Sequence, residues 1–116
     1  MLFKSVGVNV VADSFVQLSI MRIPGRMVIV IGDYPGANSS QNEQDNRHYM
    51  RISYTHIFEP CDAQEIYEMF LNVVDLSRTF ESPVVVRPTT HAAHFIQKVK
   101  FGEYTPRVAS SPIFDP

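Results

Sequence analysis

The sequence predicts an α/β fold with three layers and a mostly parallel sheet. Apolar runs of strand length are separated by segments with helical periodicity, so that strand, helix and strand alternate along the chain. This alternation is typical of parallel sheets with helices packed on their faces. A chain of 116 residues that is 45% hydrophobic is long enough for one packed domain and too short for two.

The first predicted helix covers residues 9–22 and ends before Pro24 and Gly25. One side of this helix carries residues at helical spacing, which are Val11, Ala12, Phe15, Leu18 and Ser19. Residues 27–31, MVIVI, follow as the most apolar run in the chain. Such a short continuous run between Gly25 and Gly32 predicts a strand that is buried on both faces, as in a parallel sheet.

The middle of the chain carries weaker signals. Residues 43–51 predict a short helix, and residues 53–58 predict a second strand with partial alternation, which ends at Glu59 and Pro60. The next helix has the clearest signals of all. Asp62 is its predicted N-cap.

Glu65 lies three residues after Asp62, at the capping-box position. An apolar stripe at helical spacing then runs along this helix towards Phe80. Residues 84–86 then predict a third strand. Residues 104–116 carry prolines and no clear period, so we expect a tail or a truncated linker there and a single domain over residues 1–103.

Composition excludes several classes of function. A net charge of −2 and a pI near 6.0 give no basic footprint for nucleic acid. The single cysteine, Cys61, excludes an internal disulfide and any cysteine-ligated zinc or iron–sulfur site built from this chain alone. No signal peptide and no apolar run of about 20 residues is found, so the expected location is the cytoplasm, away from the membrane.

The histidines and the cysteine carry little chemistry by themselves. His91 and His94 follow the third strand and could serve a metal or an acid–base role, although their spacing is not that of a helical zinc site. We expect His56 to be packed and hydrogen-bonded in its strand and His48 to be solvated. Cys61, at a helix start, could have a lowered thiol pKa or could simply fill a capping position.

Residues 36–49, GANSSQNEQDNRHY, form a polar stretch directly after the apolar run. Their amides and hydroxyls can donate and accept hydrogen bonds in many directions, and Arg47 is the only nearby fixed cation. By residue type alone, a solvated turn is the more ordinary interpretation. The position of the stretch after a parallel strand favours a ligand site, because ligands bind outside the carboxyl ends of such strands.

Five segments of the sequence, taken in order, resemble the α subunit of indolepyruvate ferredoxin oxidoreductase and its thiamine-diphosphate-dependent 2-oxoacid oxidoreductase relatives. The most unusual is SSQNEQDNR, residues 39–47, preceded by Gly-Asp-x-Pro-Gly. The others are KSVGVNVVAD, EPCDAQE, the helix through DLS, and SPVVVRPTTHAAH. The resemblance covers roughly residues 4–103.

The resemblance implies an incomplete pyrimidine-binding fold, which holds the aminopyrimidine ring of thiamine diphosphate. It implies cofactor-binding roles for Gly7, Asn9, Ser39, Ser40, Gln41 and Asn42. It also implies that Arg47 contacts the carboxylate of a 2-oxoacid, in an oxidative decarboxylation that passes electrons to ferredoxin. Magnesium, the diphosphate and the iron–sulfur clusters would be held by segments or subunits outside this chain, and no residue of this chain is assigned a catalytic or metal-binding role.

Several departures from the family pattern affect this expectation. The family commonly has Arg at the position of His91, Ser at Cys61 and His at Asn38, which puts the aryl pyruvate substrate in doubt. The family also has an earlier segment with an activating glutamate that this sequence does not contain, so we expect the isolated chain to be inactive.

Three predicted strands without that segment should expose an edge and an apolar face. We therefore expect a homo-oligomer, or docking on the remaining parts of the oxidoreductase, including a diphosphate domain and a γ or β subunit. The alternative is a non-catalytic interaction or regulatory module derived from the same domain.

Overall fold

The computed structural model describes residues 1–36 and 40–106. Its sheet has four parallel strands in the order β1 (Leu2–Lys4), β2 (Val28–Gly32), β4 (Val84–Val86) and β3 (His56–Phe58). Leu2, Val30, Val86 and Phe58 lie opposite one another across the sheet. The parallel pairing of β2 with β4 confirms the layer argument made from the sequence.

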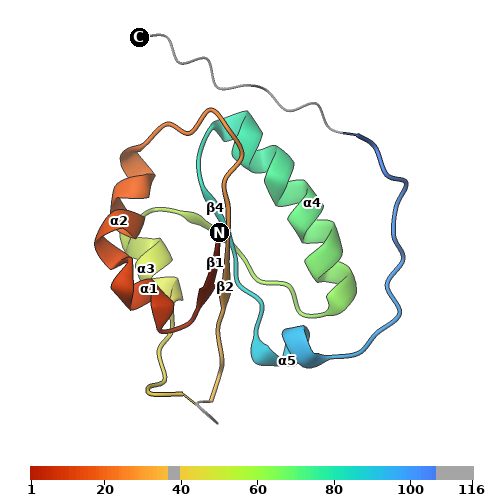
Figure 1. Ribbon diagram of the computed structural model, residues 1–116, viewed down its shortest axis with the longest axis horizontal. Helices are drawn as coiled ribbons and strands as arrows, with labels where there is room; N and C mark the ends of the chain where they lie inside the picture. Colours follow the sequence, from red (N-terminus) through yellow and green to blue (C-terminus); the bar gives the residue numbers. More distant parts are fainter. Residues whose placement is uncertain (37–39, 107–116) are drawn as a thin grey trace.

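The helices cover both faces of the sheet, which confirms the α/β fold. One face carries three short helices, α1 (Gly7–Val10), α2 (Ala12–Gln17) and α3 (Arg47–Ile52), and a 3₁₀ turn, η1 (Leu18–Ile20), follows α2. The other face carries the long helix α4 (Ala63–Phe80), and α5 (Thr90–His94) lies near the start of α4 (Figure 1). No described helix is long and apolar enough to cross a membrane.

Two apolar clusters hold the layers together. Under α1–α3 the buried residues are Val8, Phe15, Ile29, Ile31, Met50 and Val85. Under α4 they are Val73, Val84 and Val86. Because successive strand residues point to opposite faces, the β4 sequence VVV contributes to both clusters and is buried throughout. The strand predicted over residues 27–31 is β2, in which Ile29 and Ile31 are buried but Val28 and Val30 are half-buried, so its predicted burial on both faces is met only on the side of α1–α3.

The long helix α4 follows its predicted signals. Its N-cap is Asp62, whose Oδ1 accepts a hydrogen bond from the backbone N–H of Glu65 at 2.9 Å. The Glu65 carboxylate accepts the N–H of Cys61 at 2.9 Å, one residue earlier than in a capping box. At the other end, Glu81 adopts a left-handed conformation with φ 50° and stops the helix.

The structure corrects the prediction at the N-terminus. There are four strands rather than three, because β1 is an edge strand of three residues, LFK, with no continuous apolar run to reveal it. The helix predicted over residues 9–22 begins earlier, breaks between α1 and α2, and passes into η1. Of its expected apolar positions only Phe15 is fully buried.

The middle of the chain also differs from prediction. The short helix begins at Arg47 and not at residue 43, because Gln44 donates to the carbonyl oxygen of Ser5 and the backbone N–H of Asn46 donates to Asp33 instead of continuing a helix. The strand predicted over residues 53–58 is reduced to its last three residues. His56 is exposed, since β3 is an edge strand, so its predicted packing is wrong; His48 is exposed as expected.

The segment after α5 is extended and runs beside α4. The side-chain amide of Gln64 pairs with both backbone groups of Lys100, at 2.8 and 3.2 Å, and the Tyr67 hydroxyl accepts the N–H of Gly102 at 3.0 Å. The rings of Tyr67 and Phe101 meet edge to face. Residues 104–106 have no regular structure, and the rest of the predicted tail lies outside the described residues.

Candidate functional site

Four polar residues follow directly on the four strands. Ser5 follows β1, Asp33 follows β2, Glu59 follows β3 and Arg87 follows β4. All strands are parallel, so these side chains gather at one edge of the sheet, where α/β proteins bind ligands.

Asp33 is the centre of this edge and is only 1% exposed. Its Oδ1 accepts hydrogen bonds from Ser5 Oγ at 2.6 Å and from Asn46 Nδ2 at 3.1 Å. Its Oδ2 accepts the backbone N–H of Asn46 at 3.2 Å and Arg87 Nε at 2.7 Å. A carboxylate buried this deeply is tolerated because a cation and several further donors replace its hydration.

Arg87 ties the ends of three strands together. Besides the bond to Asp33, its Nη1 donates to Glu59 Oε1 at 2.6 Å, and its Nη2 lies 3.7 Å from Asp45 Oδ1. The guanidinium is only 9% exposed, so little water screens these pairs. The planar fork of arginine suits such simultaneous contacts with several carboxylates.

Arg47 lies outside this buried centre and is paired with Asp45. Its Nε lies 2.8 and 2.9 Å from the two carboxylate oxygens, and its Nη2 lies 2.5 Å from Oδ2. The hydrogen bonds from Arg47 hold the pKa of Asp45 well below its usual range, and Asp45 in turn raises the pKa of Arg47. The residue expected to bind a substrate carboxylate thus already binds a carboxylate of its own chain.

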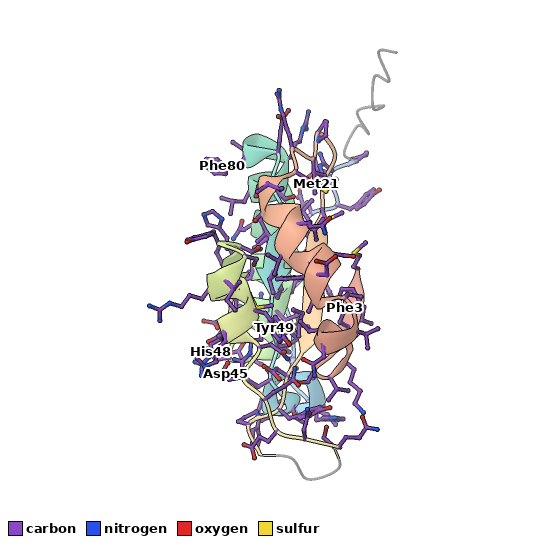
Figure 2. All side chains as sticks on the ribbon, turned by 90° about the vertical axis from the view of Figure 1, so that its left-hand side faces the viewer. Phe3, Met21, Asp45, His48, Tyr49 and Phe80 are labelled. Carbon is purple, nitrogen blue, oxygen red and sulfur yellow. The ribbon has the colours of Figure 1, made fainter. Side chains whose placement is uncertain are left out.

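A cluster of side-chain amides, formed by Asn9, Asn42, Gln44 and Asn46, lies beside the buried centre. Asn9 Nδ2 donates to Gln44 Oε1 at 2.8 Å, and Gln44 Nε2 donates back to Asn9 Oδ1 at 3.0 Å. Asn42 Nδ2 also donates to Gln44 Oε1, at 3.1 Å. The hydroxyl of Tyr49, labelled on α3 in Figure 2, donates to Asn9 Oδ1 at 2.8 Å.

The structure brings together some of the predicted cofactor-binding residues and separates others. Asn9 and Asn42 meet through Gln44, and Gly7 begins α1, two residues before Asn9. Gln41 is exposed in the connecting loop. Ser40 points elsewhere, since its Oγ donates to the hydroxyl of Tyr34 at 3.1 Å. Ser39 lies outside the described residues.

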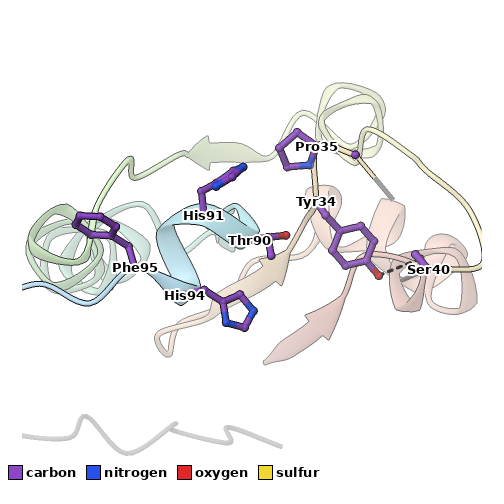
Figure 3. Close-up of a pocket in the computed structure, with 8 residues that line it drawn as sticks. Tyr34, Pro35, Ser40, Thr90, His91, His94 and Phe95 are labelled. Atoms are coloured by element: carbon purple, nitrogen blue, oxygen red, sulfur yellow. Dashed lines mark hydrogen bonds between the residues drawn. The ribbon is translucent and has the colours of Figure 1, made fainter. Parts of the chain in front are cut away.

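Ser40 belongs to a hollow of about 490 Å³ between the loop after β2 and helix α5. Figure 3 shows Tyr34 and Ser40 on one side of it and His91 and His94 on the other. Both histidines are exposed. The part of the chain that the structure describes contains no group of three or more His, Cys, Asp or Glu residues that would hold a metal ion.

Cys61 is exposed, and its thiol is not activated. A hydrogen bond with Glu65 raises the pKa of Cys61, and burial and the nearby Asp62 carboxylate add to the rise. The possibility of a lowered thiol pKa at this helix start is therefore wrong, because the neighbouring carboxylates outweigh any effect of the helix end. Cys61 lies one residue before the N-cap, Asp62, and its backbone N–H donates to Glu65.

Sequence reasoning missed the residues that organise the site. These are Ser5, Asp33, Gln44, Asn46, Glu59 and Arg87. A usable signal was present for Asp33, Glu59 and Arg87, because each is the first polar residue after a predicted strand, whereas Ser5 follows β1, which the sequence did not reveal. Gln44 and Asn46 gave no such signal, since their partners are distant in the sequence.

Comparison with known proteins adds the remaining evidence. No family model and no solved structure matches the chain. It is 41% identical over 100 residues to the indolepyruvate oxidoreductase subunit IorA of Methanothermobacter marburgensis, which is 86% of this chain and 16% of the relative. The chain is related to a segment of IorA. The resemblance inferred from the polar stretch is thus confirmed.

Other IorA subunits match at similar levels. Identity is 37% over 100 residues with the subunit of Pyrococcus horikoshii, covering 86% of this chain and 15% of the relative. Sequence identity is 40% over 100 residues with the subunit of Thermococcus kodakarensis, which is 86% of this chain and 16% of that relative. The chain therefore spans about one sixth of the length of the IorA subunits it matches.

Proposed function

We propose that this chain forms part of the cofactor-binding side of a 2-oxoacid:ferredoxin oxidoreductase that acts on indolepyruvate or a similar aryl pyruvate. The observation that carries the proposal is the 41% identity to IorA over 86% of the chain. The polar side chains at the carboxyl edge of the parallel sheet support it, because that edge is where such a fold binds ligands. The proposal includes a cytoplasmic location.

The proposed cofactor is thiamine diphosphate, and the amide cluster fits its aminopyrimidine ring. The ring edge carries an amine donor beside a ring-nitrogen acceptor, and a side-chain amide presents the complementary acceptor and donor. Asn9 and Asn42 provide such groups, and the proposal includes Gly7, Ser39, Ser40 and Gln41 as further cofactor-binding residues. When bound, the cofactor supplies the nucleophilic carbon for decarboxylation of a 2-oxoacid.

Arg47 is the proposed partner of the substrate carboxylate. It is more than half exposed and already holds the Asp45 carboxylate in a two-pronged contact, which is the geometry that a 2-oxoacid carboxylate would take. The substrate would therefore compete with Asp45 for the same guanidinium. Magnesium, iron–sulfur clusters and the path to ferredoxin belong, in this proposal, to other segments or subunits.

We expect the isolated 116-residue chain to be inactive. The test is an assay of the purified chain with thiamine diphosphate, magnesium, indolepyruvate and a redox dye. The expected result is no turnover above the rate without protein. Substrate-dependent dye reduction by the chain alone would contradict the division of the site proposed here.

The second candidate is a non-catalytic interaction or regulatory module. It is favoured by apolar side chains that stand exposed around the edge strand β1 and α1, including Leu2 and Val10. Either candidate predicts association with a second copy or with other parts of the oxidoreductase, because the unpaired backbone groups of an edge strand can form hydrogen bonds with a strand of another chain. A stable monomer at micromolar concentration by light scattering, with no binding to those parts, would contradict both.

A further inference from the structure

The pairing of Asn9 with Gln44 has the form of a recognition contact. Each amide donates to the other, at 2.8 Å from Asn9 to Gln44 and at 3.0 Å in return. The two residues come from separate elements, since Asn9 lies in α1 and Gln44 in the irregular stretch before α3. Asn9 is exposed, so a ligand arriving from solvent can reach its amide.

Gln44 Nε2 lies in a pocket of hydrogen-bond acceptors. Three oxygens surround it, which are Asn46 Oδ1 at 2.6 Å, Asn9 Oδ1 at 3.0 Å and the carbonyl oxygen of Ser5 at 3.1 Å. An amide nitrogen has only two hydrogens, so three acceptors share two donors. If the amide of Gln44 were turned by 180°, its Oε1 would face these three acceptor oxygens and would repel them. The hydrogen-bond partners therefore fix which atom of the amide is nitrogen.

The acceptor pocket does not depend on Gln44 for its shape. Asn46 is buried and is held by Ser5 and Asp33, through bonds of 2.9 and 3.1 Å from its Nδ2. Asn9 is held by the hydroxyl of Tyr49 at 2.8 Å. Gln44 is only half-buried, and its described contacts are hydrogen bonds. Its side chain can therefore leave while the groups around it stay in place.

We infer that the amide of Gln44 is an internal ligand, which fills a recognition site for an amino-heteroaromatic ring and is displaced when the ring binds. The ring class is one that carries an amine beside a ring nitrogen. An amide pairs with that edge through two parallel hydrogen bonds, as Asn and Gln do with adenine. The amine takes the place of Gln44 Nε2, and the ring nitrogen takes the place of Oε1.

This inference rests on the proposed function and deepens it. It assigns the ring-reading contact to Asn9 and makes Gln44 a competitor of the ligand rather than a contact. Removing the Gln44 side chain should therefore strengthen binding. Removing a residue that merely lined a cofactor site would weaken binding. The two roles therefore predict opposite changes in ligand affinity.

The test titrates the 116-residue chain with 4-amino-2-methylpyrimidine and follows the side-chain amide signals by ¹⁵N NMR. Gln44→Ala is expected to bind three- to tenfold more tightly than the unchanged protein, because the two exposed hydrogen bonds between Gln44 and Asn9 no longer compete with the ligand. Gln44→Glu should also bind more tightly, since a carboxylate is repelled from three oxygens. Asn9→Asp, which cannot donate, should bind at least tenfold more weakly.

Gln17→Ala is the matched control, because Gln17 is exposed on α2 and contacts only Asp13 among its described side-chain partners. It should bind as the unchanged protein does. Binding by the unchanged protein that is equal or tighter than by both Gln44 variants overturns the internal-ligand inference and leaves the proposed function standing. Absence of binding by the unchanged protein and by both Gln44 variants overturns the inference and the proposed pyrimidine site together.

Discussion

Asp33 and Arg87 form the ion pair on which the ligand edge depends. Asp33 orders Ser5 and Asn46, and these two residues surround Gln44. The pair is therefore a positioning feature for the amide cluster. Its burial makes it sensitive to loss of either partner, since an isolated buried charge has no water to replace the missing contact.

Replacing Arg87 with methionine should lower the free energy of unfolding by about 3–5 kcal/mol, because Asp33 would remain buried without its cation. Urea unfolding followed by circular dichroism measures the change. Arg22→Met is the matched control. Arg22 pairs with Glu81 but is 80% exposed, so water screens the pair and its loss should change stability far less than the loss of Arg87. Equal losses from both substitutions would contradict the positioning role.

The pair between Asp45 and Arg47 gives a stability that depends on pH. Arg47 lowers the pKa of Asp45 in the folded chain, so the stabilisation is complete above the unfolded pKa of about 4 and is lost as the pH falls through the folded value. Asp45→Asn should therefore be less stable than the unchanged protein at pH 7, by up to about 1 kcal/mol. The difference should shrink below about pH 4.

The same comparison in 1 M sodium chloride tests the electrostatic cause. Salt at that concentration shortens the screening length to about 3 Å, so the difference at pH 7 should also shrink. A stability difference that stays constant from pH 7 to pH 2 would show that Asp45→Asn acts through packing or backbone contacts instead.

At the scale of elements, length and periodicity decided what could be predicted from the sequence. The 18-residue α4 has an apolar stripe and an Asp62 cap, and it was placed correctly. The strand β1 has three residues, too few for any pattern. The helix α3 begins later than its sequence suggests, because Asn46 is bound to Asp33 and Ser5, and those contacts cannot be inferred from local spacing.

Met50 should be the main anchor of helix α3, because it is 2% exposed in the cluster under α1–α3, with Tyr49 half-buried beside it. Met50→Ala should lower the free energy of unfolding by about 2–5 kcal/mol. Ile52→Ala in the same helix is the control, because Ile52 is 61% exposed and its truncation should change stability by about 0.5 kcal/mol or less. Urea unfolding checks both; a larger loss from Ile52 would mean that α3 packs through its other side.

At the scale of the whole molecule, the buried charged and amide side chains gather at the carboxyl edge of the sheet. Exposed apolar residues are spread more widely: Met21 and Phe80 lie at the opposite end from Asp45 (Figure 2), whereas Phe95 lines the hollow beside the carboxyl edge. The sequence allowed the carboxyl edge of the sheet to be located, because that edge follows from parallel strands. It did not reveal which side chains converge there, since Ser5, Asp33 and Arg87 meet only through the fold.

The central claim is that this chain can serve as the matched segment of an IorA subunit. The most direct measurement replaces the matched 100 residues of the Methanothermobacter marburgensis subunit with those of this chain and assays the assembled enzyme for indolepyruvate-dependent dye reduction. The account predicts activity within about tenfold of the parent, a loss of about 1.4 kcal/mol or less in transition-state stabilisation. A chimaera that folds, assembles and binds cofactor but shows no activity would contradict it.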